Sequence, residues 1–186
     1  RAVKDRQTSE PLTMNVIASH DTKRGEDARA RLNVLSNIPG EWIEATKNWR
    51  NLNKSYKKFD SKREIPSSND EYFIYQTLCA HLQMNAEIDE SFISRLEKFL
   101  VKAMREAKVN SSWSDPDTYY EDIVLEFTRN ILAAGSEFRN GFLLFMERII
   151  PFGIVNSLTQ LILKNTVPGV PDTFQGTETW NLSFVD

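Results

Sequence analysis

Apolar residues recur every three or four positions over most of the chain, which is the spacing of amphipathic helices. One such segment, 26–38, ends before Pro39-Gly40, and its apolar face consists of Ala28, Leu32, Leu35 and Ile38. The same spacing predicts helices over 40–59, 70–83, 89–109, 117–135 and 137–165. Pro151 and Gly153 leave open whether the last of these is one helix or two.

Two short stretches have the length and composition of strands. Residues 14–19 (MNVIAS) form a β-branched run, and a second extended run lies near 171–174, among prolines and glycines. Residues 1–13 give no periodic signal. Two strands make no stable sheet alone, so the helices must hold the chain together. We therefore predict a mainly α fold with at most two short strands, which can be neighbours in a larger sheet.

Helix boundaries are predicted from capping residues. Ser68 or Asn69 is expected to cap the helix over 70–83, and Ser114 or Asp115, followed by Pro116, the helix over 117–135. Gly135 is expected at the end of the latter helix.

Composition and charge exclude several classes of protein. The 186 residues are 40% hydrophobic and 26% charged, the balance of one soluble domain. A net charge of −3 predicts neither a nucleic-acid nor a membrane partner. The single cysteine, Cys79, excludes an internal disulfide, and neither a signal peptide nor a membrane-spanning run is recognised, so a cytoplasmic location is expected. A start at Arg1 and an end at NLSFVD suggest a piece of a longer protein.

A His-Asp pair, His20-Asp21, follows the first predicted strand. It can be a structural pair that caps the next helix. A metal site is disfavoured because the only other histidine, His81, lies in an apolar helix. At the carboxyl end of a barrel strand, the same pair can bind adjacent sugar hydroxyls and stabilise an oxocarbenium-like transition state.

Four blocks carry a family resemblance, and together they cover nearly the whole chain. They are SHDTKRGEDARARLNVLSNIPGEW, NDEYFIYQTL, KAMREAKVNSSWSDPDTYYE and NSLTQLILKNTVPGVPDTFQGTETWNLSFVD. In this order they resemble segments of the maltooligosyltrehalose synthases, isomerases of the α-amylase superfamily. HDTKR together with PGVPDTFQGTE is the most specific combination.

The resemblance implies a place in a (β/α)8 barrel. Residues 14–25 resemble strand seven and its site loop, 26–150 a helical insertion, and 151–186 the last barrel helix with strand eight and its loop. Asp21 then matches the acidic residue that stabilises the transition state, and His20 matches its companion in the same sugar subsite. The nucleophile and the acid/base belong to strands four and five, so the chain alone is expected to be inactive.

The implied reaction converts the reducing-end α-1,4 bond of a maltooligosaccharide into an α,α-1,1 bond by intramolecular transglycosylation, without a cofactor. Water must be excluded, and the helical insertion can supply the walls of a closed pocket. The implied partners are the maltooligosaccharide and the remainder of the barrel.

Five further residues are candidates for substrate binding. Lys23 and Arg24 can donate to sugar hydroxyls or pair with Glu26 or Asp27. Trp113 can stack on a sugar ring or fill the core. Gln175 and Glu178 follow the second predicted strand, where a barrel loop would face the site. Structural roles are expected for two further pairs, Trp42 and Trp49 in the core, and Asp70 and Glu71 at a helix N-terminus.

Two alternative functions remain open from the sequence. One is a hydrolase or glucanotransferase of the same superfamily. The other is a helical interaction module without catalysis, which predicts that His20, Asp21 and Lys23 differ in exposure and do not line a common hollow.

Overall fold

The computed structural model describes residues 2–19, 22–60, 63–173 and 179–184. Within these ranges the fold is mainly α, as predicted. The helices are α1 (Ala2–Ser9), α2 (Glu26–Asn37), α3 (Pro39–Leu52), α4 (Ser68–His81), α5 (Glu90–Ala107), α6 (Thr118–Leu132) and α7 (Glu137–Thr166), with a 3₁₀ helix η1 (Asn53–Tyr56). The strands are β1 (Met14–Asn15), β2 (Lys58–Phe59), β3 (Glu64–Ile65) and β4 (Val170–Pro171).

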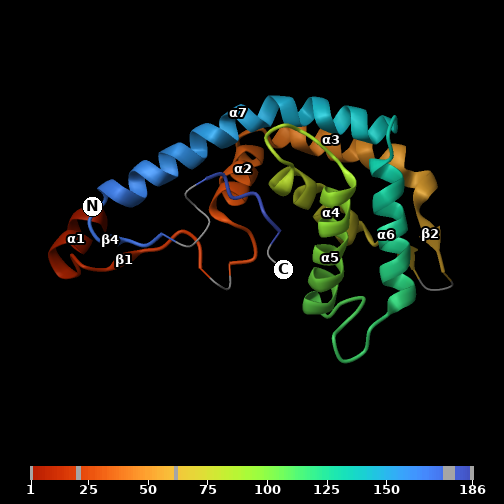
Figure 1. The fold of residues 1–186 in the computed structure, drawn as a ribbon, viewed down its shortest axis with the longest axis horizontal. Helices are drawn as coiled ribbons and strands as arrows, with labels where there is room; N and C mark the ends of the chain where they lie inside the picture. Colours follow the sequence, from red (N-terminus) through yellow and green to blue (C-terminus); the bar gives the residue numbers. More distant parts are fainter. Residues whose placement is uncertain (1, 20–21, 61–62, 174–178, 185–186) are drawn as a thin grey trace.

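Helix α7 spans the length of the molecule (Figure 1). Its N-terminal half lies above α4, α5 and α6, while its C-terminal half leads towards β1, β4 and α1 (Figure 1). Helix α2 packs against α7 and α4. The chain thus consists of a helical body at one end and a small strand pair at the other.

The two predicted strand regions are neighbours. β1 and β4 pair in parallel, with Met14 opposite Val170 and Asn15 opposite Pro171. The backbone approaches closely here, since a Cβ on Gly169 (φ +130°) would lie 2.5 Å from the Thr13 carbonyl oxygen. β1, the helices and β4 therefore form a β–α–β connection with an unusually long helical crossover.

Two predictions about elements were wrong. Residues 2–9 form α1, which buries no side chain and so has no apolar periodicity to reveal it. The helix expected over 40–59 ends at Leu52 and is followed by η1, and residues 58–65, expected as a helix end and a loop, contain an antiparallel hairpin, β2–β3, which brings the described short strands to four instead of two. Strands of two residues are too short to show an alternating pattern.

Helix starts also differ from prediction. Ser67 caps α4 by accepting a hydrogen bond from the Asp70 amide at 3.1 Å, and Asp117 caps α6 by accepting from the Tyr120 amide at 2.9 Å. Each segment offered several Ser, Asn or Asp candidates in a row, and pattern alone cannot choose among them. α6 ends at Leu132, and Gly135 (φ +84°) supplies the left-handed turn that follows.

The core is built around Trp49, as its position in the apolar stripe predicted. Its ring lies edge-on to those of Trp42, Tyr75, Phe138, Phe142 and Phe145, with centroids 5.4–5.8 Å away. Edge-to-face contacts of this kind add about 0.5–1.5 kcal/mol each beyond simple burial. Cys79 is fully buried, as are Ile74, Leu78 and Ala80 of the same helix.

Helix α7 is a single helix that continues through Pro151. Ser136 caps it, and Val167-Pro168 ends it. Beyond Pro151 many of its apolar side chains are exposed: Phe152, Val155, Leu158, Leu161, Ile162 and Leu163.

By length and composition alone, α7 could cross a membrane, contrary to the expectation from sequence. One such helix is weak evidence of a membrane span, because core helices of soluble proteins satisfy the same criterion. The N-terminal half of α7 packs in the aromatic core through Phe138, Phe142 and Phe145.

Candidate functional site: a cavity beside the His-Asp segment

A cavity of about 430 Å³ lies between α4, α5 and the loop that precedes α2. Its apolar lining includes Phe73, Phe99, Ala103 and Met104. Polar and charged groups line the rest of it: Lys23, Arg24, Ser67, Asn69, Asp70, Lys102, Glu106 and Asn110. An apolar surface faced by hydrogen-bonding groups is typical of sites for small polar molecules.

Lys23 and Arg24 enter this cavity from the loop after the predicted site pair. The Lys23 ammonium lies 3.0 Å from a carboxylate oxygen of Glu106 on α5. The Arg24 guanidinium donates to the Thr77 hydroxyl at 3.4 Å and lies 5.3 Å from the Phe73 ring centroid. Burial lowers the pKa of Arg24 from its ordinary value. Both side chains therefore contact the helical body, not Glu26 or Asp27 as one reading of the sequence proposed.

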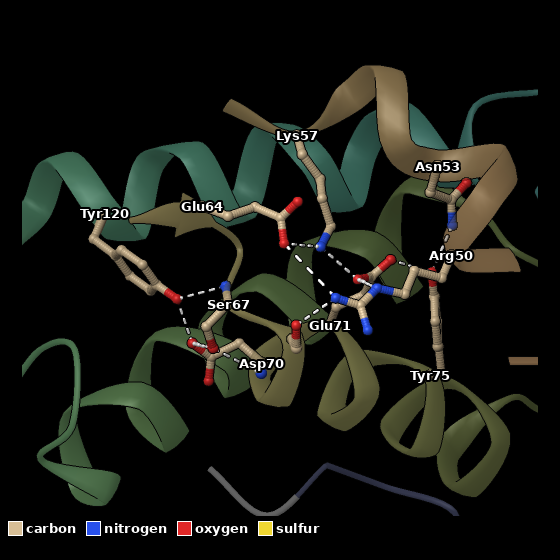
Figure 2. Close-up of polar contacts among 10 residues, drawn as sticks. Arg50, Asn53, Lys57, Glu64, Ser67, Asp70, Glu71, Tyr75 and Tyr120 are labelled. Carbon is tan, nitrogen blue, oxygen red and sulfur yellow. Dashed lines mark hydrogen bonds and ion pairs between the residues drawn. The ribbon is translucent and has the colours of Figure 1, made fainter. Parts of the chain in front are cut away.

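Asp70, which also lines the cavity, is held by hydrogen bonds from two neighbouring side chains. One of its carboxylate oxygens accepts hydrogen bonds from the Tyr120 hydroxyl and, at 2.8 Å, from the Asn110 amide (Figure 2 shows the Tyr120 contact). Burial, together with the hydrogen bond to Asp70, raises the pKa of Tyr120 to about 12, so its hydroxyl remains a proton donor at neutral pH. Asp70 thus has a structural role at the start of α4, as predicted, and also lines the cavity.

A buried ionic network surrounds Glu71, the residue after Asp70 on α4 (Figure 2). The Lys57 ammonium is 2.6 Å from Glu71 and 2.9 Å from Glu64, which joins α4 to the β2–β3 hairpin. Glu71 also accepts a hydrogen bond from the Tyr75 hydroxyl at 2.7 Å. Removing one partner of such a buried pair leaves an uncompensated charge, so the network favours the observed packing of the hairpin on α4.

The structure brings together only some of the residues predicted from sequence. Lys23 and Arg24 share the cavity. Trp113 does not line it: its side chain lies in the loop between α5 and α6, 57% exposed, with the Arg105 guanidinium 5.0 Å from its ring centroid. It is therefore neither core filler nor part of this cavity.

The other four predicted residues lie outside the described part of the chain: His20, Asp21, Gln175 and Glu178. Their roles stay predictions.

Sequence reasoning missed most of the cavity lining. Phe73 and Phe99 lie in two predicted helices but were not proposed as site residues, and neither were Glu106 and Asn110. Lys102 and Glu106, four residues apart, do mark one polar face of α5, but such faces usually meet solvent. Among the described residues, no three His, Cys, Asp or Glu side chains are grouped to hold a metal ion. The cavity can bind and orient a polar ligand that also has an apolar face.

The fold is that of a β–α–β unit whose crossover is enlarged into a helical body. A cavity of this body lies next to the loop that precedes α2.

No family model matches the chain. A protein of Mycobacterium tuberculosis named as a maltooligosyl trehalose synthase is 31% identical over 178 residues, which cover 95% of this chain and 21% of that protein.

Solved structures agree with the sequence match. A maltooligosyl trehalose synthase crystal structure matches 97% of the chain with a TM-score of 0.84 and 31% identity, over 24% of its own length. The maltooligosyltrehalose synthase of Arthrobacter ramosus matches all of the chain, with a TM-score of 0.80 and 28% identity, over 22% of its own length. The chain is therefore similar, over nearly its whole length, to one segment of the maltooligosyl trehalose synthases, and it spans about a fifth of the length of the curated relatives it matches.

Proposed function

We propose that the chain is the part of a maltooligosyl trehalose synthase that completes the sugar-binding end of its catalytic barrel. The observation that carries this proposal is the match of nearly the whole chain, in sequence and in fold, to one segment of these enzymes. The parallel pairing of β1 with β4 suits neighbouring strands seven and eight of a barrel.

The proposed reaction is an isomerisation at the reducing end of a maltooligosaccharide. An enzyme carboxylate displaces O4 of the terminal glucose from the anomeric carbon of the preceding glucose, and O4 takes up a proton. The terminal glucose stays bound and turns over. Its anomeric hydroxyl then attacks the covalent intermediate and loses its proton, giving the α,α-1,1 bond with no net consumption of water.

In this proposal Asp21 stabilises the transition state and His20 binds the same sugar. Lys23 and Arg24 present donors to the terminal glucose from the wall of the cavity, where the Phe73 and Phe99 rings supply an apolar surface. Gln175 and Glu178 are proposed to bind the same sugar. Trp113, which is exposed on another loop, is a candidate for stacking on a more distant sugar.

We also propose that this chain alone is inactive. Retaining glycoside chemistry needs a nucleophile and an acid/base carboxyl roughly 5 Å apart. The resemblance assigns both groups to barrel strands four and five, for which the chain has no counterpart. The remainder of the barrel would supply them and would also cover the exposed apolar face of α7.

The test uses the full-length parent enzyme with maltopentaose, and follows reducing ends and free glucose. We expect reducing ends to disappear without matching glucose release. Asp21→Asn should lower kcat at least a hundredfold, since it removes the charge that favours the transition state.

The alternatives predict different products. A hydrolase would increase the number of reducing ends, and a glucanotransferase would leave it constant while changing chain lengths. No conversion by a folded, full-length protein would favour the interaction module.

A further inference from the structure

Contacts at Asn181, Leu182 and Phe184 hold the C-terminal segment 179–184 on the helical body. The backbone N–H of Asn181 donates to the Asp27 carboxylate at 2.7 Å, and the Leu182 carbonyl oxygen lies 3.1 Å from Nδ1 of His81. The Phe184 ring is buried against the rings of Phe92, Phe99 and His81. Although this segment has no regular secondary structure, its Leu182 and Phe184 side chains are buried.

His81 is the central residue of this attachment. It is the last residue of α4, it is fully buried, and its ring stacks on that of Phe184 with centroids 4.5 Å apart. Since a carbonyl oxygen only accepts, Nδ1 must carry the proton in the contact with Leu182. Nε2 has no hydrogen-bond partner among the described residues. The imidazole therefore acts here as a single donor with an apolar face.

The C-terminal segment also contacts residues that line the cavity. The backbone of Phe184 forms an antiparallel bridge with Arg24. Arg24 in turn contacts Thr77 and Phe73 and lines the cavity beside Lys23. Phe99, which packs against both His81 and Phe184, is also part of the lining. The position of Arg24 thus depends on where the C-terminal segment lies.

We propose that His81 is a positioning residue for the substrate cavity: by holding Leu182 and Phe184 on the helical body, it keeps Arg24 in the cavity wall. The inference rests on the proposed function, in which the cavity that Arg24 lines binds the terminal glucose. When Arg24 is displaced, the terminal glucose is held less tightly and water competes for the covalent intermediate.

The experiment compares His81→Leu with His81→Asn in the full-length parent. Leu fills a similar volume but cannot donate, whereas the Asn amide reproduces the Nδ1 donor. With maltopentaose, His81→Leu should raise the fraction of turnovers that release glucose about tenfold, the effect of losing one buried hydrogen bond of about 1.4 kcal/mol. His81→Asn should return that fraction to within about twofold of wild type, since the donor is restored.

A second readout does not depend on activity. Hydrogen–deuterium exchange should become faster over residues 22–30 and 179–184 in His81→Leu, and should be near wild type in His81→Asn. Phe184→Leu, which removes the stacked ring, should behave like His81→Leu and replaces it if that variant does not fold. Phe127→Leu is the control, because Phe127 is fully buried in α6 and makes no ring contact with the C-terminal segment.

Unchanged exchange over 22–30 in His81→Leu, or equal glucose release in His81→Asn, His81→Leu and Phe127→Leu, would overturn the inference. Failure of the wild-type parent to consume reducing ends would instead overturn the proposed function. The exchange measurement would then still decide whether His81 holds Arg24 in place.

Discussion

Two buried basic residues, Arg31 and His81, connect α2, α4 and the C-terminal segment. Nη1 of Arg31 donates to the carbonyl oxygens of Leu82 and, at 3.4 Å, of Cys79, at the end of α4. Burial lowers the pKa of Arg31 to about 10, so it stays charged at neutral pH. A cation at a helix C-terminus satisfies carbonyl groups that have no partner within the helix.

Replacing Arg31 by Met should lower the free energy of unfolding of the chain by about 2–4 kcal/mol, because buried carbonyl oxygens lose a charged donor. Urea denaturation monitored by circular dichroism measures this. Arg29→Met is the matched control on the exposed side of α2: Arg29 also donates to a carbonyl oxygen, that of Ile17 at 2.7 Å, but in contact with solvent, so a loss of only about 0.5–1 kcal/mol is expected. Equal losses in both variants would contradict the role given to Arg31.

His81 should make the stability of the chain depend on pH. Burial, reinforced by the nearby Arg24 and Arg31 cations, lowers its pKa from 6.5 to about 4. The unfolded chain therefore binds more protons than the folded chain between these values, and stability falls as pH drops below 6.5. From pH 7 to pH 5 this group should cost about 2 kcal/mol.

Urea denaturation of wild type and His81→Asn at pH 7 and pH 5 measures that difference. The variant should lose less stability than wild type over this range, because Asn does not titrate. Parallel losses in the two proteins would show that His81 does not titrate with a lowered pKa.

Among the elements, α7 has two interior glycines, and the space around them differs: Gly153 is tightly packed and Gly141 is not. A Cβ on Gly153 would lie 3.1–3.3 Å from the Cγ, Cβ and Cα atoms of the buried Arg31. A Cβ on Gly141 would meet only the Trp49 ring nitrogen, at 3.8 Å. Gly153 therefore permits the close packing of α2 on α7, whereas Gly141 does not serve that contact.

Gly141→Ala should stabilise the chain by about 0.5–1 kcal/mol through helix propensity. Gly153→Ala should destabilise it by about 1 kcal/mol, because overpacking against the Arg31 backbone outweighs the same gain. Thermal or urea denaturation of the two variants side by side is the measurement. Stabilisation of both would contradict the close packing at Gly153.

Most helices could be predicted from the sequence because their apolar stripes are long, as in α3 and α5. The parallel neighbours β1 and β4 were also anticipated from two short extended runs. α1 and the β2–β3 hairpin were missed because neither has an apolar period: α1 is exposed, and Lys57 and Glu64 tie the hairpin to α4 through ion pairs.

The cavity was harder to predict than the helices. Lys23 and Arg24 were found through their position next to His20-Asp21. Phe73 and Phe99 contribute through the packing of α4 against α5, which the pattern of either helix alone does not reveal. The attachment of Phe184 to His81 joins residues more than a hundred positions apart in sequence, and local pattern carries no signal for it.

At the scale of the whole molecule, the exposed apolar side chains of α7 beyond Pro151 indicate a surface that the remainder of the proposed parent enzyme covers. Leu158 and Ile162, 49% and 62% exposed, lie one turn apart on it. Changing both to Gln should alter the unfolding free energy of the chain alone by less than about 0.5 kcal/mol, as for exposed positions.

In the full-length parent the same double change should cost about 2–4 kcal/mol, because two buried side chains would lose their apolar contacts. Denaturation of both proteins measures the contrast. Equal behaviour in the chain and in the parent would show that the remainder of the protein does not cover this face.

The central claim is that the parent enzyme keeps the terminal glucose bound while it forms the new bond. The most direct test incubates it with an equal mixture of unlabelled and uniformly ¹³C-labelled maltopentaose, and weighs the non-reducing products by mass spectrometry. The account predicts products of two masses only, fully light and fully heavy, because each glucose returns to the chain it left. Products of intermediate mass, or labelled and unlabelled free glucose as the main products, would contradict it.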